Sequence, residues 1–155
     1  MASAEAPHWL KTRAQFQAAL KSPPVARTAH FALHRLHWSA DAQTAVPSAT
    51  KPLFTPASGT WLGAMTPKRW ARRAVTRNAI QRQVRALGHE QAGNPAGGWP
   101  ASVWLVRLRA EFDRNQFPGA SSLALKRAVR GELRKLFARA LQAQRPPGPP
   151  EAPAS

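Results

Sequence analysis

The chain has 155 residues, a formal net charge of +16 and no cysteine. This length suits one domain with a modest core, whereas two domains would be cramped. A charge of this size indicates a polyanionic partner, with nucleic acid first and an anionic membrane surface second. The lack of cysteine excludes disulfides, thiolate zinc sites and cysteine nucleophiles, and it fits a cytoplasmic protein.

Residues 1–8 carry no helical or strand pattern and are expected to form a flexible N-terminus. The first helix is expected to begin after Thr12, because Thr12 and Gln15 have the spacing of a capping box. Two consecutive prolines then end this helix. Residues 25–38 alternate between apolar and polar side chains, which predicts one short strand and one longer strand.

Residues 39–59 contain three prolines and show no periodicity, so they are predicted to form a flexible insertion. Residues 60–65 predict a further short strand. A second helix is predicted over residues 74–87, with Gly88 as its C-terminal cap. The apolar run in residues 102–108 is typical of a central strand that is covered on both faces.

The last helix is predicted to begin at Ser121 or Ser122 and to continue to about Gln142, with an apolar stripe along one side. Residues 143–155 are rich in proline and alanine and are predicted to form a disordered tail. The chain is therefore expected to form one domain over residues 9–142, between two flexible ends.

The segment from Lys68 to Arg85 is the most informative part of the chain. It holds seven cations within eighteen residues, and no carboxylate occurs between Ala42 and His89. The charge of this segment therefore has no partner nearby in the sequence. Arginine predominates, and its planar guanidinium pairs with phosphate through two hydrogen bonds and stacks on bases, which favours RNA or DNA as the partner.

A helix over this segment would have two chemically different faces. At 100° per residue, Ile80, Val84 and Leu87 share one face and can pack on a sheet. The opposite face would present hydrogen-bond donors to a phosphate backbone from Asn78, Arg82 and Arg85. Further cations lie at the N-terminal end, where exposed amides and the helix dipole favour an anion. These cations are Arg72, Arg73 and Arg77.

Three other classes of protein agree less well with this pattern. A helix-turn-helix protein needs two consecutive short helices, whereas a strand is predicted directly before the basic helix. A protein-only metallonuclease needs clustered carboxylates, whereas the seven Asp and Glu residues are scattered from Glu5 to Glu151. Membrane binding is disfavoured because no apolar run approaches the roughly 20 residues of a transmembrane helix, and the basic helix lacks a bulky interfacial face.

The basic segment resembles the signature of the bacterial ribonuclease P protein component. That family has a pair of lysines after a strand, then a helix with the pattern Arg-Asn-Arg, followed by isoleucine and further arginines. Three positions depart from this pattern, since Arg69 replaces the second of the paired lysines, Ala79 replaces the second arginine of Arg-Asn-Arg, and Gln81 stands where lysine is usual. The matching residues are Lys68, Arg69, Arg72, Arg73, Arg77, Asn78, Ile80, Arg82 and Arg85.

The resemblance implies an α+β fold with the element order α-β-β-β-α-β-α, a central mixed sheet and a left-handed βαβ crossover. It implies a subunit of ribonuclease P, an endoribonuclease that removes the 5′ leader of precursor tRNA in a Mg²⁺-dependent reaction. The RNA subunit would carry out the hydrolysis and bind most of the Mg²⁺, so no protein side chain is expected to be catalytic. The implied partners are the ribonuclease P RNA and precursor tRNA, with no membrane and no protein partner required.

The resemblance also implies two sites of contact with RNA. A cleft between the first helix and the sheet would hold the leader at Phe16, Leu20 and His34, where a ring can stack on a base. The basic segment would bind the RNA subunit. The alternative function is a non-catalytic basic module that binds RNA or DNA in association with ribosomes or the nucleoid. The expected RNA-binding residues are Lys68, Arg69, Arg72, Arg73, Arg77, Asn78, Arg82 and Arg85.

Overall fold

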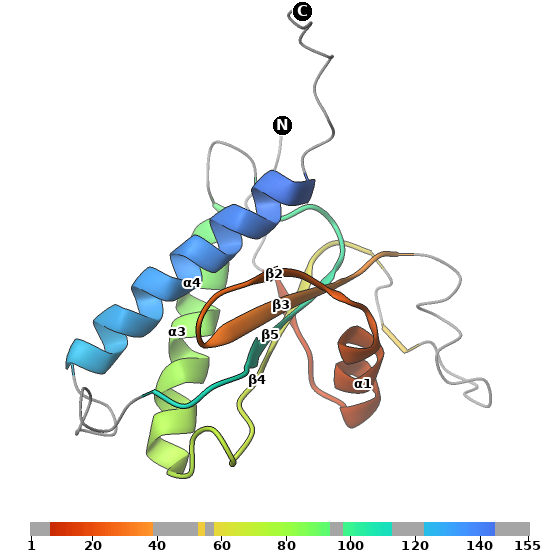
Figure 1. Ribbon diagram of the computed structural model, residues 1–155. Helices are drawn as coiled ribbons and strands as arrows, with labels where there is room; N and C mark the ends of the chain where they lie inside the picture. Colours follow the sequence, from red (N-terminus) through yellow and green to blue (C-terminus); the bar gives the residue numbers. More distant parts are fainter. Residues whose placement is uncertain (1–6, 39–52, 55–57, 94–97, 113–122, 145–155) are drawn as a thin grey trace, which may run out of the picture.

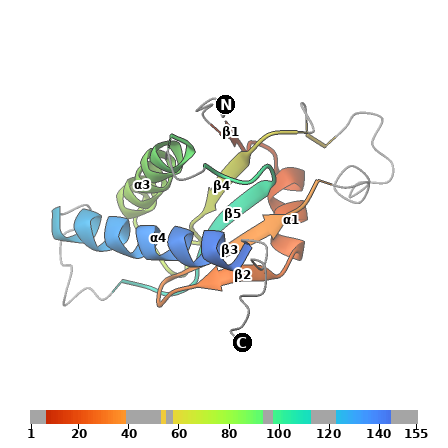
Figure 2. The same ribbon diagram turned by 90° about the horizontal axis from the view of Figure 1, so that it is seen from above.

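The computed structural model describes residues 7–38, 53–54, 58–93, 98–112 and 123–144. Within these residues the chain forms three helices and five strands (Figures 1 and 2). In chain order, the elements are β1 (His8–Trp9), α1 (Arg13–Lys21), β2 (Pro24–Arg27), β3 (Phe31–Leu36), β4 (Trp61–Met65), α3 (Ala74–Ala92), β5 (Val103–Leu108) and α4 (Leu123–Gln144).

The five strands form one mixed sheet in the order β1-β4-β5-β3-β2. β1 and β5 each pair with β4 in parallel, whereas β3 pairs antiparallel with both β5 and β2. Because β4 and β5 are parallel neighbours, the chain between them must cross over, and α3 lies within this connection. The predicted element order, mixed sheet and βαβ crossover are therefore present, and β1 is an additional strand at the edge.

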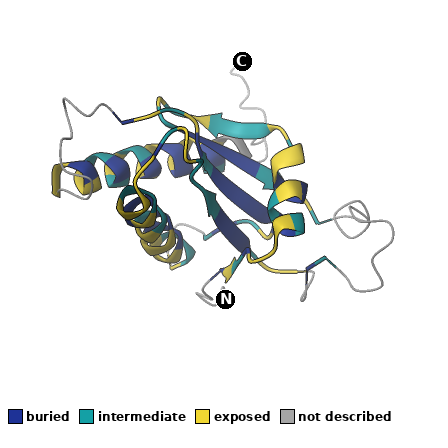
Figure 3. Cartoon of the chain, turned by 90° about the horizontal axis from the view of Figure 1, so that it is seen from below, coloured by how far each residue is buried: buried dark blue, intermediate teal, exposed yellow. Residues whose placement is uncertain are grey.

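The helices cover both faces of the sheet. α3 and α4 lie side by side on one face, and α1 lies on the other (Figures 1 and 2). Side chains of β5 alternate between the two faces, since Trp104 and Val106 join the core under α3 and α4, while Val103 and Leu105 join the core under α1. The prediction that this strand is covered on both faces is confirmed, and Figure 3 shows the burial of the middle strands.

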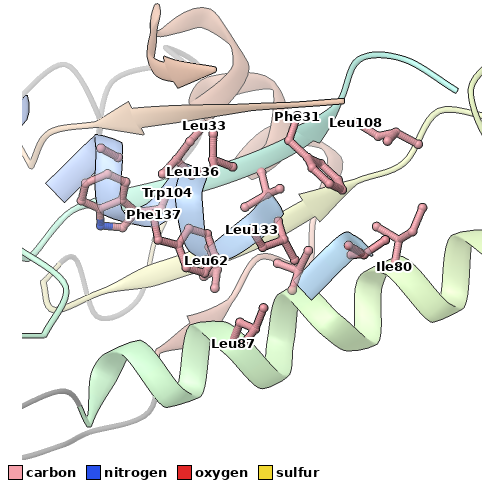
Figure 4. Packing of buried hydrophobic residues seen from close by; sticks show 14 of the residues in the cluster. Phe31, Leu33, Leu62, Ile80, Leu87, Trp104, Leu108, Leu133, Leu136 and Phe137 are labelled. Carbon is pink, nitrogen blue, oxygen red and sulfur yellow. The ribbon is translucent and has the colours of Figure 1, made fainter. Parts of the chain in front are cut away.

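The larger core cluster holds α3 and α4 against the sheet. Figure 4 shows Ile80 of α3 and Leu133 of α4 pointing toward side chains from the strands, among them Phe31 and Leu62. Each of these four side chains is at most 1% exposed. Burying an aliphatic or aromatic side chain of this size contributes roughly 1.5–3 kcal/mol, so this face of the sheet supplies most of the hydrophobic stabilisation of the domain.

The start of α1 agrees with the predicted capping box. The Thr12 side chain accepts a hydrogen bond from the Gln15 backbone N–H at 3.2 Å, and the Gln15 side-chain oxygen accepts one from the Thr12 N–H at 3.1 Å. Gln15 is buried, and its Nε2 donates to the Leu53 carbonyl at 3.0 Å. The cap therefore also attaches part of the 39–59 segment to α1.

Phe54 shows that the segment 39–59 is not wholly an open insertion. Its ring is fully buried and contacts the rings of Trp38 and Trp61, with centroid distances of 5.4 and 5.3 Å. No periodicity surrounds Phe54 in the sequence, and the prediction of a flexible insertion over residues 39–59 is wrong at this residue. The rest of that segment lies outside the described residues, apart from 53–54 and 58–59.

Several predicted boundaries differ from the structure. His8 belongs to β1 rather than to a flexible N-terminus, because its backbone N–H donates to the Thr60 carbonyl at 2.8 Å and pairs β1 with β4. α4 continues to Gln144, so residues 143–144 belong to the helix and not to the tail. The predicted caps at 121–122 and the tail residues 145–155 lie outside the described residues.

Gly88 does not cap α3, contrary to prediction, because the helix continues to Ala92 and Gly93 is its C-cap residue. Gly88 is buried where α3 meets the sheet. A Cβ atom at this position would lie 2.2 Å from Cδ2 of Leu62, a residue with no exposed surface. The glycine therefore serves close packing of the helix on β4 rather than helix termination.

Replacing Gly88 with alanine should destabilise the protein, even though alanine favours helix by about 1 kcal/mol. The added methyl must displace the buried Leu62 side chain, and overpacking of this kind costs about 1–3 kcal/mol. Gly131 provides a matched control on α4, since a Cβ atom there would have no atom within 4 Å. Gly131→Ala should stabilise by about 0.5–1 kcal/mol. Urea denaturation measures both changes, and equal effects of the two substitutions would contradict the packing role of Gly88.

Candidate nucleic-acid interface

The basic segment begins in a tight turn that follows β4. Two consecutive backbone N–H groups donate to the Pro67 carbonyl at 3.0 and 3.1 Å, and α3 begins three residues later. The N-cap residue Arg73 makes no side-chain capping bond, and its cationic side chain stands at the positive end of the helix dipole. Four cations are exposed along this turn and its approach to α3: Lys68, Arg69, Arg72 and Arg73.

The two faces of α3 differ as predicted. The apolar face packs on the sheet through Ile80, Val84 and Leu87, each at most 2% exposed. The opposite face is exposed and carries Asn78, Arg82 and Arg85. Since the buried face fixes the rotation of the helix about its axis, these three polar side chains must point into solvent together with the cations of the turn.

Arg77 and Gln81 hold the basic segment in shape. Arg77 is half-buried, and its Nη1 donates to the carbonyls of Ala71 and Arg72 at 3.0 and 2.8 Å. Gln81 Nε2 donates to Oγ1 of Thr66 at 2.9 Å and fastens α3 to the end of β4. A guanidinium has five N–H donors, so Arg77 retains donors for a phosphate while it braces the turn. The sequence predicts Arg77 as an RNA contact but gives no sign that it also braces the turn.

Two aromatic rings restrain exposed arginines. The guanidinium carbon of Arg69 lies 5.3 Å from the centroid of the Trp70 ring, and that of Arg85 lies 5.5 Å from the Trp9 ring. Such a contact contributes about 0.5–1 kcal/mol at an exposed site. A side chain that is already restrained loses less entropy when it binds a phosphate. Trp9 was missed in the sequence because β1, which brings it beside α3, was not expected.

α3 and α4 enclose a hollow of about 290 Å³ that continues the basic face of α3. Asn78 and Arg82 line it together with Lys126 of α4. Ala79, which stands where the family pattern has arginine, also lines it and is 7% exposed. The small side chain leaves open space there, and α4 contributes a cation. Lys126 was not among the predicted site residues, although the sequence places it beside Arg127 and close to Arg130 in the last helix, a cluster of cations that could have indicated a second basic surface.

The three residues predicted to line a leader cleft lie on the α1 face in different environments. Phe16 is half-buried against the smaller core cluster, and Leu20 is 37% exposed. They are one turn apart on α1 and form an apolar edge. His34 is only 4% exposed, so its ring offers little surface to a base. Base contact at Phe16 and Leu20 stays a prediction, and His34 has another role in the structure.

His34 is held between two groups that determine its tautomer. Its Nδ1 lies 2.6 Å from the Ser22 carbonyl, and its Nε2 lies 3.1 Å from Nε of Arg107. A carbonyl only accepts and a guanidinium only donates, so Nδ1 carries the proton and Nε2 accepts. Burial lowers the pKa of His34, the Ser22 bond offsets part of this effect, and Arg107 and Arg27 lower the pKa further. The imidazole is therefore neutral and links the end of α1 to β5.

The described residues contain few side chains that could bind a metal ion. They contain no group of three or more His, Cys, Asp or Glu side chains placed to hold a metal ion. Of the three carboxylates in the described part of the chain, Glu132 bonds His30 at 2.8 Å and Glu90 lies 3.5 Å from Arg134. No helix in these residues is both long and apolar enough to cross a bilayer.

Comparison with known proteins agrees with this geometry. The family model "Ribonuclease P" matches residues 5–141. The ribonuclease P protein component of Burkholderia pseudomallei is 32% identical over 126 residues, which cover 81% of this chain and 76% of the relative. The chain belongs to the ribonuclease P protein family. The family member from Paraburkholderia xenovorans is 30% identical over 141 residues, which cover 90% of this chain and 86% of that protein.

The family fold is also found in the solved structure of the Staphylococcus aureus RNase P protein. The two structures align with a TM-score of 0.55 over 86% of this chain and 94% of that one, at 16% sequence identity. At this identity the comparison concerns the fold alone. It agrees with the mixed sheet and with the predicted α+β class.

The pKa of His34 predicts how stability depends on pH. Its value is lower in the folded chain than the ordinary value near 6.5, so the unfolded chain takes up more protons as the pH falls. The free energy of unfolding should therefore fall below about pH 6.5. Two cations, Arg107 and Arg27, face the ring and oppose its protonation. Burial and Arg35 also lower the pKa of His37, which adds a dependence of the same sign.

Urea denaturation between pH 5 and 8 should separate the contributions of His34 and His37 to the pH dependence of the free energy of unfolding. His34→Gln should flatten the loss of stability at low pH, because glutamine does not titrate. Equal slopes in the wild-type chain and in His34→Gln would contradict the assignment of this dependence to His34.

Proposed function

We propose that the chain is the protein subunit of a ribonuclease P holoenzyme and that α3 with its preceding turn binds the RNA subunit. The one-sided distribution of charge on α3 is the observation that carries this proposal. Its buried face packs on the sheet, while its exposed face presents cations with no described carboxylate in ion-pair distance. Such a surface neutralises backbone phosphates and releases counterions.

The chemistry of phosphodiester hydrolysis is assigned to the RNA subunit. The described residues lack a cluster of carboxylates that fits Mg²⁺, which prefers oxygen ligands in octahedral geometry. We propose that the RNA subunit carries out the hydrolysis and binds most of the Mg²⁺, as the family resemblance implies. The protein contributes positive charge between two polyanions, the RNA subunit and precursor tRNA, and so reduces the concentration of Mg²⁺ needed to bring them together.

The α1 face is proposed to receive the 5′ leader of precursor tRNA. Phe16 and Leu20 supply apolar surface beside a sheet that carries Arg27 and Arg107, and proteins that bind single-stranded RNA combine positive charge with stacking surfaces of this kind. We propose that the chain acts in the cytoplasm, where precursor tRNA is its substrate, and that it requires no further protein partner. A basic module of ribosomes or the nucleoid is the alternative, and it would not change the rate of leader removal.

Reconstitution tests the function directly. The full-length chain, added to a bacterial ribonuclease P RNA at low Mg²⁺, should increase the rate of precursor tRNA cleavage, because it lowers the repulsion between the two RNAs. The measurement is the single-turnover rate as a function of Mg²⁺ concentration. RNA binding without any change in that rate would sink the proposal and favour the alternative module.

Substitutions on α3 test the binding surface. Arg82→Ala combined with Arg85→Ala should weaken binding to the RNA subunit and reduce the slope of log K against log salt by roughly one unit per lost phosphate contact. Arg134→Ala is the matched control, since this exposed arginine of α4 already has Glu90 at 3.5 Å. Filter binding over a salt series gives the slopes. The same slope in the double variant and the wild-type chain would mean that these arginines do not contact phosphate.

A further inference from the structure

A second hollow lies on the flank of α4 that faces away from α3. It has a volume of about 370 Å³ and lies between α4 and the turn that joins β2 to β3, where Thr28 and Ala29 line it. Figure 2 shows α4 between α3 and β2. This outer hollow is therefore separate from the α3 surface and from the face of the sheet that α1 covers. Its cations belong to α4 and are Arg127, Lys135 and Arg139.

The three cations form a row along an exposed side of α4. At 1.5 Å per residue, the distance along the helix axis from Arg127 to Arg139 is about 18 Å. Gly131 lies in this row and also lines the hollow. It is exposed, and a Cβ atom at this position would have no atom within 4 Å. The middle of the row is therefore open to the close approach of a bulky polyanion.

The carboxylate that lines the hollow is bonded to the β2–β3 turn. Glu132 Oε2 accepts hydrogen bonds from Thr28 Oγ1 and from the His30 backbone N–H, each at 2.6 Å, and Oε1 lies 2.8 Å from His30 Nδ1. The Glu132 side chain is only 15% exposed. In the described part of the chain, no carboxylate forms an ion pair with a cation of the row. The negative charge of Glu132 thus serves to hold the turn rather than to neutralise α4.

The carbonyl groups of the turn are also bonded within the protein. Arg139 Nη1 donates to the Arg27 carbonyl at 2.7 Å, and Arg109 Nη1 donates to the Thr28 carbonyl at 2.9 Å. The His30 carbonyl accepts from the Arg109 backbone N–H at 2.7 Å. A hollow whose acceptors are bonded and whose cations have no ion pair with a described carboxylate is suited to an anion.

The lining of the hollow favours the backbone of double-stranded RNA as this anion. The lining residues that the structure describes include no aromatic ring, whereas proteins that bind single strands stack bases on such rings. Double-stranded RNA is recognised mainly through its shape, its phosphates and its 2′-hydroxyl groups. A row of about 18 Å is long enough to face several phosphates of a duplex.

The outer hollow is also continuous with the proposed surface for the RNA subunit. Lys126 lines the hollow between α3 and α4, and Arg127, the next residue, lines the outer hollow. Both side chains are exposed. The positive surface of α3 therefore continues across the first turns of α4, and an RNA that rests on α3 is close to the outer hollow.

We propose that the outer hollow of α4 binds the phosphate backbone of a double-helical segment of the RNA subunit, with Arg127 and Lys135 as the main contacts and Arg139 as a further contact. The proposal rests on the proposed function for the identity of the RNA. Gly131 lets the backbone approach α4, and Glu132 keeps the β2–β3 turn in place as the opposite wall.

Binding of the full-length chain to a bacterial ribonuclease P RNA tests these contacts. Arg127→Ala combined with Lys135→Ala should raise the Kd about tenfold and reduce the slope of log K against log salt by roughly two units. Lys11→Ala combined with Lys21→Ala is the matched control, since it removes the same net charge from exposed positions beside and within α1. The control should leave the Kd within about twofold. An unchanged slope in the α4 variant, or equal losses in both variants, would overturn the proposal.

Substitutions at Gly131 test the hollow without removing a cation. Gly131→Glu places a carboxylate in the row and should weaken binding to the RNA subunit, because it repels the phosphates. Gly131→Gln has nearly the same shape without the charge and should bind at least about threefold more tightly than Gly131→Glu. Both variants should fold, since the position has open space, and circular dichroism checks this. Equal affinities of the two variants would contradict a phosphate site here.

Reconstituted holoenzyme identifies which RNA occupies the hollow. At saturating protein, Arg127→Ala with Lys135→Ala should leave the affinity for mature tRNA unchanged, because the contact is with the RNA subunit. Normal binding to the RNA subunit combined with a loss of affinity for mature tRNA would overturn this assignment and place tRNA in the hollow.

The rate of leader removal separates this inference from the proposed function. If the wild-type chain stimulates cleavage and the α4 double variant binds the RNA subunit as the wild-type chain does, the inference fails and the proposed function stands. If the wild-type chain gives no stimulation, the proposed function fails. An RNA duplex of about 16 base pairs, the span of a typical double-stranded RNA-binding domain, then tests the hollow directly. Equal binding of this duplex by the wild-type chain and the double variant would overturn the inference.

Discussion

The packing of α3 on the sheet is the interaction on which the basic surface depends. Gly88 lets the helix approach Leu62 closely, and Ile80 and Val84 bury the same face nearer its N-terminus. Once that face is fixed, the 100° rotation per residue determines the direction of every other side chain on the helix. The cations therefore gather on one side, and their position follows from apolar packing rather than from any attraction among themselves.

This arrangement leaves like charges close together. Their electrostatic repulsion is limited because most of the side chains are exposed to solvent, and several are held in place by neighbouring groups. Most cations of the turn and α3 are exposed, where water and salt screen their repulsion. Arg77 bonds backbone carbonyls, and Trp9 and Trp70 hold two further arginines. Arg107 differs, because it is partly removed from water and its hydrogen-bond partner among the described residues is a neutral imidazole. A polyanion that binds both regions would relieve this repulsion and stabilise the folded chain by linkage.

Much of the fold could be predicted because its signals are local. The capping box at Thr12, the apolar run of β5 and the two-faced pattern of α3 each depend on residues within a few positions of one another. The features that local sequence patterns do not predict depend on contacts between residues far apart in the sequence. Gly88 is of the residue type that often caps a helix, but it is buried against Leu62 of β4. Phe54 lies in an aperiodic segment, but its ring packs between the rings of Trp38 and Trp61.

The sequence by itself determined the element order, the family and the face of α3 on which the cations lie, because helical periodicity and charge are properties of consecutive residues. Only the tertiary structure decided how separate segments combine into sites. It placed Lys126 beside Asn78 and Arg82, and it buried His34 between Ser22 and Arg107. Strand register and helix docking bring these residues together across tens of positions, and no local pattern carries that information.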